Sequence, residues 1–425
     1  MRLRDRLGAR GPSKANLAAG SAESGASRAG GGQGWEQTRW TAPVETPLMG
    51  VLGPRAVPRG METLSVPDAA TVAAAVRALE GPAAAPVHAS RPVVVLDIET
   101  SGLGASLVPY MAALAWHERG RVHLMQWTLH SPGAERVFLA DVFSCLDRVL
   151  QPGTRLLSYN GKSFDLPRLR TRAQRLALGD GASRGEVPSL FAAHLDLVLA
   201  TRRVFKAALP NCRLSTIESE VLGHRRRGDM SGMEIAELWE RMVATPGLAE
   251  ALADGGADTT AQDALDPFLR DDLAAAQLHN RGDVFGLCSV ATAVAQRLEQ
   301  PGSLSEAMGA ATHLRQIEAA EAATEVLAPL VDRTGLSGPG RERVWVDAAL
   351  LLADLHRAAD RHEAAAGLWR RVCEASVGHV RAHEALAKHL EHRARRPDLA
   401  LEVAKASLAP CPRRLARLEK KTAAL

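Results

Sequence analysis

This sequence has few aromatic residues and a small net charge. Its 425 residues include only two Tyr and seven Phe, and the formal net charge at pH 7 is +4. An aromatic platform on which nucleic-acid bases could stack is therefore not evident, and the field of the whole molecule is weak. Any nucleic acid would have to be bound through local basic clusters, mainly by its backbone and with little sequence selectivity.

Paired cysteines and long apolar runs are also lacking. The five cysteines are scattered, odd in number and form no Cys-x-x-Cys pair, so we expect neither a disulfide framework nor a zinc site. No apolar signal segment follows the basic N-terminus, and no run of about 18 apolar residues predicts a membrane span. We therefore expect a soluble, cytoplasmic protein that does not bind a membrane.

The composition changes along the chain and predicts four segments. Residues 1–60 are rich in Gly, Ala, Ser, Pro and Arg and have no hydrophobic period, which predicts a disordered tail. Residues 61–90 are interpreted as a linker with a short helix. Residues 91–300 have the pattern of an α/β domain, and residues 301–425 that of an all-helical domain.

The pattern of residues 91–300 predicts a mixed sheet flanked by helices. A short β-branched run ends at Asp97, and the next two strands are joined by a hairpin turn at Arg119-Gly120. A helix fits residues 135–150, followed by another strand and another helix, which gives the order β-β-β-α-β-α. Residues 268–298 then form one long helical pattern.

Residues 301–425 are rich in Ala, Leu and Arg and are predicted to be helical throughout. Leu352-Ala353 recurs as Leu386-Ala387 thirty-four residues later, and Ala365 has a looser counterpart at Ala400. This spacing predicts two or three degenerate helical hairpins of the tetratricopeptide-like (TPR-like) kind, which could bind a protein partner. An ordinary Ala-rich helical bundle is the alternative.

Four acidic residues, each set in an apolar run, are candidates for a metal site. Asp97 and Glu99 lie two residues apart on a predicted strand, so both side chains project from the same face. Asp165 follows Asn160-Gly161 at the junction of a strand and a helix, and Asp283 lies within the long helical pattern. Clustered carboxylates supply the oxygen ligands that Mg²⁺ or Mn²⁺ prefers.

Each acid also has an ordinary structural explanation. A lone Asp-x-Glu pair is common by chance, Asp165 could cap the N-terminus of a helix, and Asp283 could form an exposed pair with His279 one turn earlier. The apolar neighbours of that pair indicate a core-facing region instead. Ser215 and Glu218 have capping-box spacing, so Glu218 is expected to cap a helix and not to act in catalysis.

Together, the four acids have the chemistry of a two-metal site that cuts phosphodiesters. Two cations about 3.5–4 Å apart, bridged by carboxylates, activate a water molecule and stabilise the leaving oxygen of an in-line displacement. His279 is the candidate base for that water, because imidazole titrates near neutrality. Arg225, Arg226 and Arg227 form the candidate phosphate-binding loop, and a solvated charge run is an equally good explanation.

At this point the sequence resembles a known superfamily. The residues that carry the resemblance form three motifs in chain order: Asp97-Ile98-Glu99-Thr100 with Leu103, Asn160-Gly161 with Phe164-Asp165, and His279 with Asp283. They resemble the exonuclease motifs of the DEDD superfamily on a ribonuclease-H-like fold. The likeness is nearest to the YprB-like ribonuclease-H-like family and covers about residues 91–298.

The resemblance implies a role for each matching residue. Asp97 would bridge two Mg²⁺ or Mn²⁺ ions, Glu99 and Asp283 would complete the ligands of one ion, and Asp165 would hold the second. The remaining motif residues would contact the substrate, and these are Thr100, Leu103, Asn160 and Phe164. In the superfamily the catalytic histidine lies five residues before the last aspartate, or a tyrosine lies four before, whereas His279 lies four before Asp283.

The function implied is a metal-dependent nuclease that acts on DNA or RNA, with 3′–5′ exonuclease polarity. The alternative is a catalytically weak nucleic-acid-binding scaffold whose helical repeats recruit protein partners. An intact set of four buried acids favours the enzyme, because a pure binding domain gains nothing from their mutual repulsion.

Overall fold

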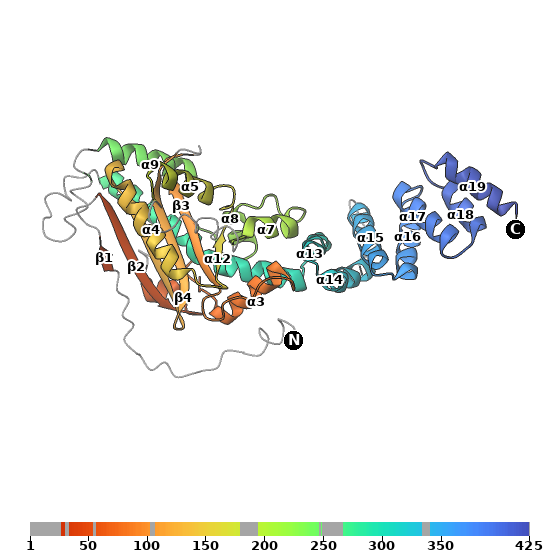
Figure 1. Ribbon diagram of the computed structural model, residues 1–425, viewed down its shortest axis with the longest axis horizontal. Coiled ribbons are helices and arrows are strands. Elements are labelled where there is room, and N and C mark those ends of the chain that lie inside the picture. The colour runs from red at the N-terminus through yellow and green to blue at the C-terminus, as the bar shows by residue number, and fades with distance from the viewer. Residues whose placement is uncertain are drawn as a thin grey trace. The chain divides into compact units, whose positions relative to one another are not determined.

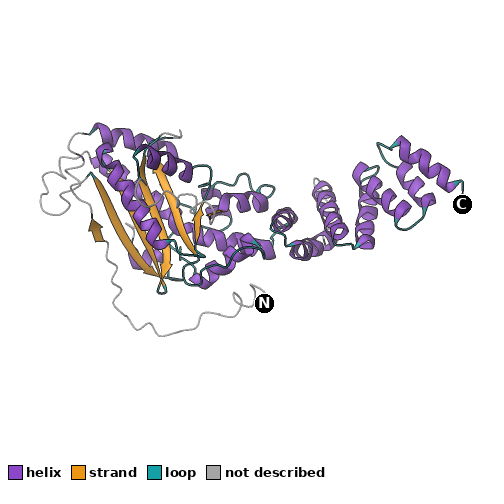
Figure 2. Ribbon diagram, in the orientation of Figure 1, coloured by secondary structure: helices purple, strands orange, loops and turns teal. Residues whose placement is uncertain are grey.

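The computed structural model describes residues 27–29, 34–53, 57–102, 107–178, 194–245, 248, 267–333 and 341–424. Contacts between residues divide the chain into two compact units. The first comprises Met1–Thr201 with Asn211–Ala295, and the second comprises Arg202–Pro210 with Gln296–Leu425. Figure 2 shows that the sheet lies in the first unit, while the described part of the second is made of helices.

A seven-stranded mixed sheet forms the centre of the first unit. Its strands are β1 (Ser27–Ala29), β2 (Trp35–Pro43), β3 (Val93–Thr100), β4 (Pro109–Glu118), β5 (Arg121–Leu129), β6 (Arg155–Ser158) and β7 (His194–Asp196). They lie in the order β1-β2-β5-β4-β3-β6-β7. The β3–β6 and β6–β7 pairs are parallel, and the other neighbouring pairs are antiparallel. This arrangement confirms the predicted α/β fold class.

The hairpin between β4 and β5 follows directly from its turn residues. Arg119 and Gly120 have φ values of 51° and 71°, as the two central residues of a type I′ turn require. This turn matches the right-handed twist of the strands, and it places Glu118 opposite Arg121. The predicted hairpin at this position is therefore confirmed.

The N-terminal segment differs from the prediction. β2 pairs with β5 along its whole length, from Trp35 opposite Leu129 to Pro43 opposite Arg121, and helix α2 (Leu48–Leu52) follows it. The disordered tail predicted for residues 1–60 is therefore wrong for this part, whereas residues 1–26 lie outside the described residues. Local composition could not reveal the strand, because its hydrogen-bond partners lie on β5, far away in the sequence.

Helices cover both faces of the sheet (Figure 1). α4 (Glu135–Val149) packs on one face, where Trp127 Nε1 donates a hydrogen bond to Asp141 Oδ2 at 2.6 Å. α12 (Pro267–Glu299) crosses the other face, where Gln126 Nε2 donates to Asn280 Oδ1 at 2.8 Å. Gln126 pairs with Ala113 of β4, and Ala113 pairs with Asp97 of β3, so the side chains of Gln126 and Asp97 lie on the same face of the sheet. α12 therefore covers the face that carries the candidate acids.

The remaining helices of the first unit surround this core. Among them α3 (Ala69–Glu80) lies in the segment interpreted as a linker with a short helix, and its N-cap Asp68 accepts a hydrogen bond from the Thr71 backbone N–H at 2.7 Å. The other helices are α5 (Asp165–Arg175), α7 (Leu197–Phe205), α8 (Leu214–Glu220) and α9 (Gly232–Ala244). The first turn of the short α7 belongs to the first unit, and its last residues to the second.

The second unit confirms the predicted all-helical domain. Its helices are α13 (Leu304–Gln316), α14 (Ala320–Arg333), α15 (Arg341–Ala358), α16 (His362–Ala375), α17 (Val380–His392), α18 (Pro397–Lys405) and α19 (Pro412–Thr422). Leu352 and Leu386 each lie six residues before the end of their helix, and Ala365 and Ala400 are each the fourth residue of theirs. All four are buried. The TPR-like assignment stays a prediction. None of the described helices has the length and apolarity needed to cross a membrane.

Candidate active site

Asp97 and Glu99 project from the inner strand β3 toward α12. The strand begins with the buried residues Val93–Leu96, so it carries the two carboxylates into the interior, and the Glu99 side chain is 14% exposed. Asn280 of α12 is fully buried and donates its Nδ2 to Asp97 Oδ2 at 2.7 Å. Asn280 therefore fixes the orientation of the Asp97 carboxylate.

Asn280 is a site residue that the motifs did not identify. Its amide is itself held by Gln126 from β5, and Arg281 Nη1 donates to Gln126 Oε1 at 2.7 Å. The signal in the sequence was weak, because an Asn next to His279 on a helix has no preferred role. Asn280 acquires its role only because α12 crosses β3 and β5 and so brings its amide to Asp97 and Gln126.

Asp165 is the first residue of α5 and lies beside β3. The Ile98 backbone N–H donates to Asp165 Oδ1 at 3.1 Å, which ties the start of the helix to the strand. The N-cap position belongs to Phe164 and has no side-chain cap, so Asp165 is not the N-cap that the alternative explanation required. Gly161 leaves room for this approach, since a Cβ there would lie 2.3 Å from Ser158 Oγ and 3.2 Å from Asp165 Oδ2.

His279 and Asp283 reach the same site from α12. His279 Nε2 lies 3.7 Å from Glu99 Oε1 and 3.7 Å from Asp283 Oδ2. Its Nδ1 lies 2.8 Å from Asp229 Oδ1. The His279 and Asp283 side chains are 19% and 16% exposed, so they do not form the exposed surface pair that was the alternative.

Burial and mutual repulsion shift the ionisation of the acids. Burial raises the pKa of Glu99 to about 8 and that of Asp165 to about 7. Burial also raises the pKa of Asp97 well above its usual range, and the charge of Asp283 adds to the effect. The cluster therefore resists full ionisation at neutral pH unless cations compensate it.

The pKa of His279 is raised as well, which for an imidazole favours the charged form. Burial lowers its pKa, but the charge of Asp283, the hydrogen bond to Asp229 and the charge of Glu99 outweigh burial and raise the pKa to about 9. The imidazole of the protein alone is consequently a cation at neutral pH. Its Nδ1–H side faces Asp229, and its Nε2 side faces the acids.

Arg226 faces the interior of the domain, contrary to its predicted role. Its Nη2 lies 2.6 Å from Glu218 Oε1 and 2.5 Å from Asp283 Oδ1, and its side chain is 5% exposed. Gly282 permits this approach, because a Cβ there would lie 3.1 Å from Arg226 Cζ. The prediction that Arg226 holds a substrate phosphate is therefore wrong, since its guanidinium already compensates buried acids.

Glu218 is not the helix cap predicted from its spacing. α8 begins at Leu214, with Arg213 as an N-cap that makes no side-chain hydrogen bond, so Ser215 lies inside the helix. Glu218 is 1% exposed, and burial raises its pKa to about 7 against the opposing charge of Arg226. Capping-box spacing failed here because the strong ion pair with Arg226 fixes the side chain inside the domain.

We expect Arg226→Ala to lower the free energy of unfolding by about 3–5 kcal/mol, because it leaves Glu218 buried without its cation. Arg225→Ala removes the exposed neighbouring guanidinium and should change that free energy by no more than about 0.5 kcal/mol. Chemical denaturation of both variants measures the difference. Addition of Glu218→Gln to Arg226→Ala should recover part of the loss, and equal stability of the two single variants would contradict the assignment.

Two of the predicted substrate residues follow Glu99 in the chain. Thr100 is 5% exposed, and its hydroxyl donates to the Gly102 carbonyl at 2.5 Å, so it holds the turn after β3. Leu103 lies outside the described residues. In the basic loop, Arg225 and Arg227 are exposed on either side of Arg226, whose side chain is only 5% exposed. Their contact with substrate phosphates stays a prediction.

The other two predicted substrate residues lie in the turn before α5. Asn160 has a positive φ of 72°, and its backbone N–H donates to Asp196 Oδ1 at 2.7 Å. The Lys162 backbone N–H donates to Asp196 Oδ2 at 3.0 Å, so this buried carboxylate shapes the turn. The ring of Phe164 has the Arg168 guanidinium 3.5 Å from its centroid. Both substrate roles stay predictions.

The acids suit a hard cation by their chemistry. Asp97, Glu99 and Asp165 are oxygen donors whose pKa values are raised, so a divalent cation would relieve the cost of ionising them. Asp283 is engaged by an arginine and a histidine instead. Within the described ranges, no group of three or more His, Cys, Asp or Glu side chains is arranged to hold a metal ion. To bind a metal ion, Asp283 would therefore have to give up its ion pair with Arg226 or with His279.

Comparison with known proteins shows what the chain is similar to. Residues 94–251 match a family model described as RNase_H superfamily. The chain is also 28% identical over 321 residues to the "Uncharacterized protein YprB" of Bacillus subtilis (strain 168), and this alignment covers 73% of the chain and 68% of that protein. These findings support a YprB-like, ribonuclease-H-like family for the chain. At the level of the superfamily, the family-model match supports nuclease-type hydrolysis, nucleic-acid binding and the use of divalent metals.

Proposed function

We propose that this protein is a divalent-metal-dependent nuclease that hydrolyses phosphodiester bonds of DNA or RNA as a 3′–5′ exonuclease. The observation that carries the proposal is the electrostatic coupling of four acids from β3, α5 and α12 in a ribonuclease-H-like domain, since burial and the charges of the other three all raise the pKa of Asp97. Their shared ionisation cost serves no purpose in an ordinary core, and it is the expected property of a site that binds cations.

Asp97, Glu99, Asp165 and Asp283 would hold two Mg²⁺ or Mn²⁺ ions. When bound, such ions supply Lewis-acid activation of a water molecule and stabilise the charge on the leaving oxygen. The surrounding chain positions the ligands: Asn280 orients Asp97, and the backbone of β3 orients Asp165. These two carboxylates are thus held in a fixed arrangement, which would lower the reorganisation needed during the reaction.

His279 would orient or deprotonate the attacking water. Asp229 accepts from its Nδ1 and so directs Nε2 toward the acids. Because the neighbouring carboxylates hold the imidazole protonated, it becomes a base only when other cations neutralise those carboxylates. The four-residue spacing to Asp283 on α12 is compatible with this position, since both side chains lie on one side of the helix.

We expect His279→Gln to lower kcat by about 10²–10⁴-fold, the usual contribution of a positioned general base or acid. Gln retains a polar side chain of similar reach but cannot accept the proton. Single-turnover cleavage rates measure the effect, and His362→Gln in the second unit serves as the matched control. A cleavage rate of His279→Gln within a few-fold of wild type would mean that the water is activated without this side chain.

Degradation of end-labelled single-stranded DNA, double-stranded DNA and RNA tests the proposed activity. With Mg²⁺ or Mn²⁺ we expect shortening of at least one substrate, and a chelator should stop it. Label at the 5′ end should persist in progressively shorter products if the polarity is 3′–5′. Release of the 5′ label as a mononucleotide would contradict that polarity, and failure to cut any substrate would contradict the nuclease.

A nucleic-acid-binding scaffold is the second candidate function. The observation that favours it is the ion pair of Asp283 with Arg226, which engages one of the four acids inside the protein. In that case the second unit would recruit a protein partner through its helices. Metal-independent binding of all three substrates without cleavage would support this candidate. A cytoplasmic location and the protein partner are part of either proposal.

A further inference from the structure

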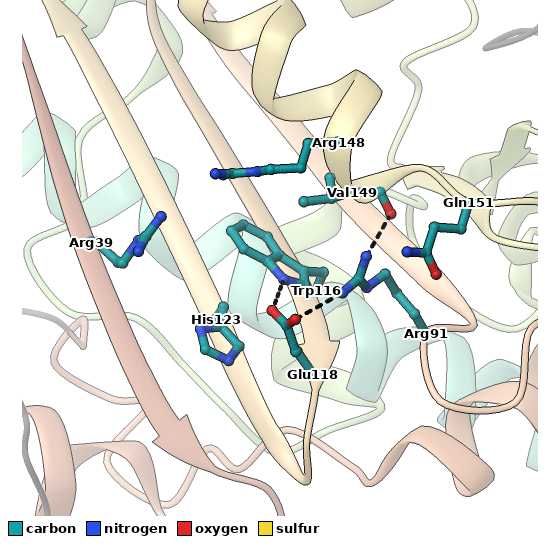
Figure 3. A pocket seen from close by; sticks show the side chains of 8 residues that line it. All are labelled: Arg39, Arg91, Trp116, Glu118, His123, Arg148, Val149 and Gln151. Atoms are coloured by element: carbon teal, nitrogen blue, oxygen red, sulfur yellow. Dashed lines mark hydrogen bonds and ion pairs between the residues drawn. The ribbon is translucent and has the colours of Figure 1, made fainter.

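A pocket of about 350 Å³ lies on the face of the sheet opposite the acids. It is lined by Arg39, Arg91, Trp116, Glu118, His123, Arg148, Val149 and Gln151 (Figure 3). Its size falls within the range of about 300–1,000 Å³ that is typical of small-molecule sites.

The strand register places this pocket away from the acid cluster. Trp116 pairs with Val94 and His123, so these three side chains share one face of the sheet. Val94 and Asp97 are three residues apart on β3 and therefore point to opposite faces. The pocket also includes Arg148 and Val149 from the end of α4, the helix that covers the face without the acids. It is thus a second site.

One end of the pocket is cationic. Figure 3 shows Arg39 of β2 and Arg148 of α4 extending toward one another beside the ring of Trp116. The hydrogen bonds found for the two guanidiniums go to sulfur: Arg39 Nη2 to Met125 Sδ at 3.5 Å, and Arg148 Nη2 to Cys145 Sγ at 3.4 Å and to Met125 Sδ at 3.7 Å. Sulfur is a weak acceptor. Among the described residues neither guanidinium forms an ion pair within 4 Å, so an anion would be well bound between them.

The floor of the pocket is aromatic. The rings of Trp116 and His123 are stacked, with centroids 5.6 Å apart and an angle of 15° between their planes. Trp116 is 4% exposed, and its Nε1 donates to Glu118 Oε2 at 3.3 Å, which fixes the ring. Burial lowers the pKa of His123 against the opposing charge of Glu118, and the charge of Arg39 acts in the same direction as burial, so the imidazole is a neutral ring near pH 7.

The other end of the pocket is polar and fixed. Arg91 pairs with Glu118 at 3.3 Å and donates to the Val149 carbonyl at 3.3 Å, so its charge is compensated. The exposed Gln151 amide lies on this side in Figure 3 and offers both a donor and an acceptor. The pocket therefore presents, in sequence, a pair of cations, a pair of stacked rings and a hydrogen-bonding edge.

We propose that this pocket binds a nucleoside monophosphate, with its phosphate between Arg39 and Arg148 and its base over the His123–Trp116 ring pair. Arginine forks match phosphate oxygens, and a base gains stacking energy on a flat neutral ring. Gln151 contacts the edge of the base. This site is independent of the proposed nuclease activity, because it lies on the other face of the sheet and uses none of the acids.

Isothermal titration calorimetry in the presence of a chelator tests the proposal without any readout of cleavage. Adenosine monophosphate should bind the full-length protein, and Arg39→Ala and Arg148→Ala should each raise its Kd by at least about tenfold. Arg39→Lys should recover only part of the affinity, because Lys lacks the planar fork. Arg77→Ala on the exposed face of α3 is the matched control and should leave Kd unchanged.

Adenosine and inorganic phosphate separate the two halves of the ligand. Each should bind at least about tenfold more weakly than the monophosphate, since each lacks one of the two contacts. Phosphate that binds as tightly as the nucleotide would overturn the assignment of a base to the ring pair. Nucleotide binding that is absent from the wild type, or equal in wild type and both alanine variants, would overturn the site. Thermal unfolding of each variant confirms that the exposed substitutions leave the fold intact.

Discussion

Replacing Asp97 with Asn is expected to lower kcat for phosphodiester cleavage by at least about 10²–10³-fold, the loss typical when one group that stabilises reacting charge is removed. The substitution keeps the shape of the side chain and an oxygen that can accept from Asn280. It removes the negative charge at the strand position where the acids of β3, α5 and α12 meet. Single-turnover cleavage at saturating Mn²⁺ measures the effect.

Stability distinguishes this result from unfolding. Burial raises the pKa of Asp97, so ionised Asp97 is unfavourable in the folded protein, and the neutral amide should not lower the melting temperature in a chelator. Asp271→Asn is the matched control, because Asp271 lies on α12 but is exposed. Its cleavage rate should equal that of wild type. Cleavage by Asp97→Asn within tenfold of wild type would remove Asp97 from the reaction.

The sequence predicted those features that depend on local pattern. The buried run of β3 predicted the direction of Asp97 and Glu99, because alternation along a strand fixes the faces. The Arg119-Gly120 dipeptide between two strand patterns predicted the hairpin, because Gly readily adopts the positive φ that a tight hairpin turn requires. The order of the motifs predicted that α5 and α12 would bring further acids to the same strand.

Features that depend on partners far away in the sequence could not be predicted. Arg226 looked like part of a solvated basic run, and only the packing of its loop against α8 and α12 shows that it compensates Glu218 and Asp283. Asn280 had no motif of its own and gained its role from the position of Asp97, 183 residues earlier. β2 could not be predicted for the same reason, because the strand with which it forms hydrogen bonds, β5, lies far away in the sequence.

The second large effect concerns pH in the presence of a chelator. Glu99 has a folded-state pKa of about 8 and Asp165 one of about 7, both above their ordinary values of 4.5 and 3.8. A raised pKa means that the folded protein favours the protonated form, so the contribution to stability is complete below the ordinary pKa and is lost as pH rises through the folded value. We expect the melting temperature of the first unit to fall by at least about 4 °C between about pH 6 and pH 9.

The His279 imidazole adds to this slope at its upper end. Its raised pKa of about 9 stabilises the folded protein below the ordinary value of 6.5, and that contribution is lost as pH rises through about 9. Differential scanning calorimetry in a chelator measures the slope, and Glu99→Gln with Asp165→Asn should flatten it. Mg²⁺ or Mn²⁺ should restore stability most at high pH, because cations bind the ionised carboxylates and only the folded protein gathers them. A melting temperature that is independent of pH, or a slope that the double variant retains, would show that these acids do not share one site. Stabilisation by the cations that increases with pH would instead support the conclusion that metal binding compensates the cost of ionising the buried acids.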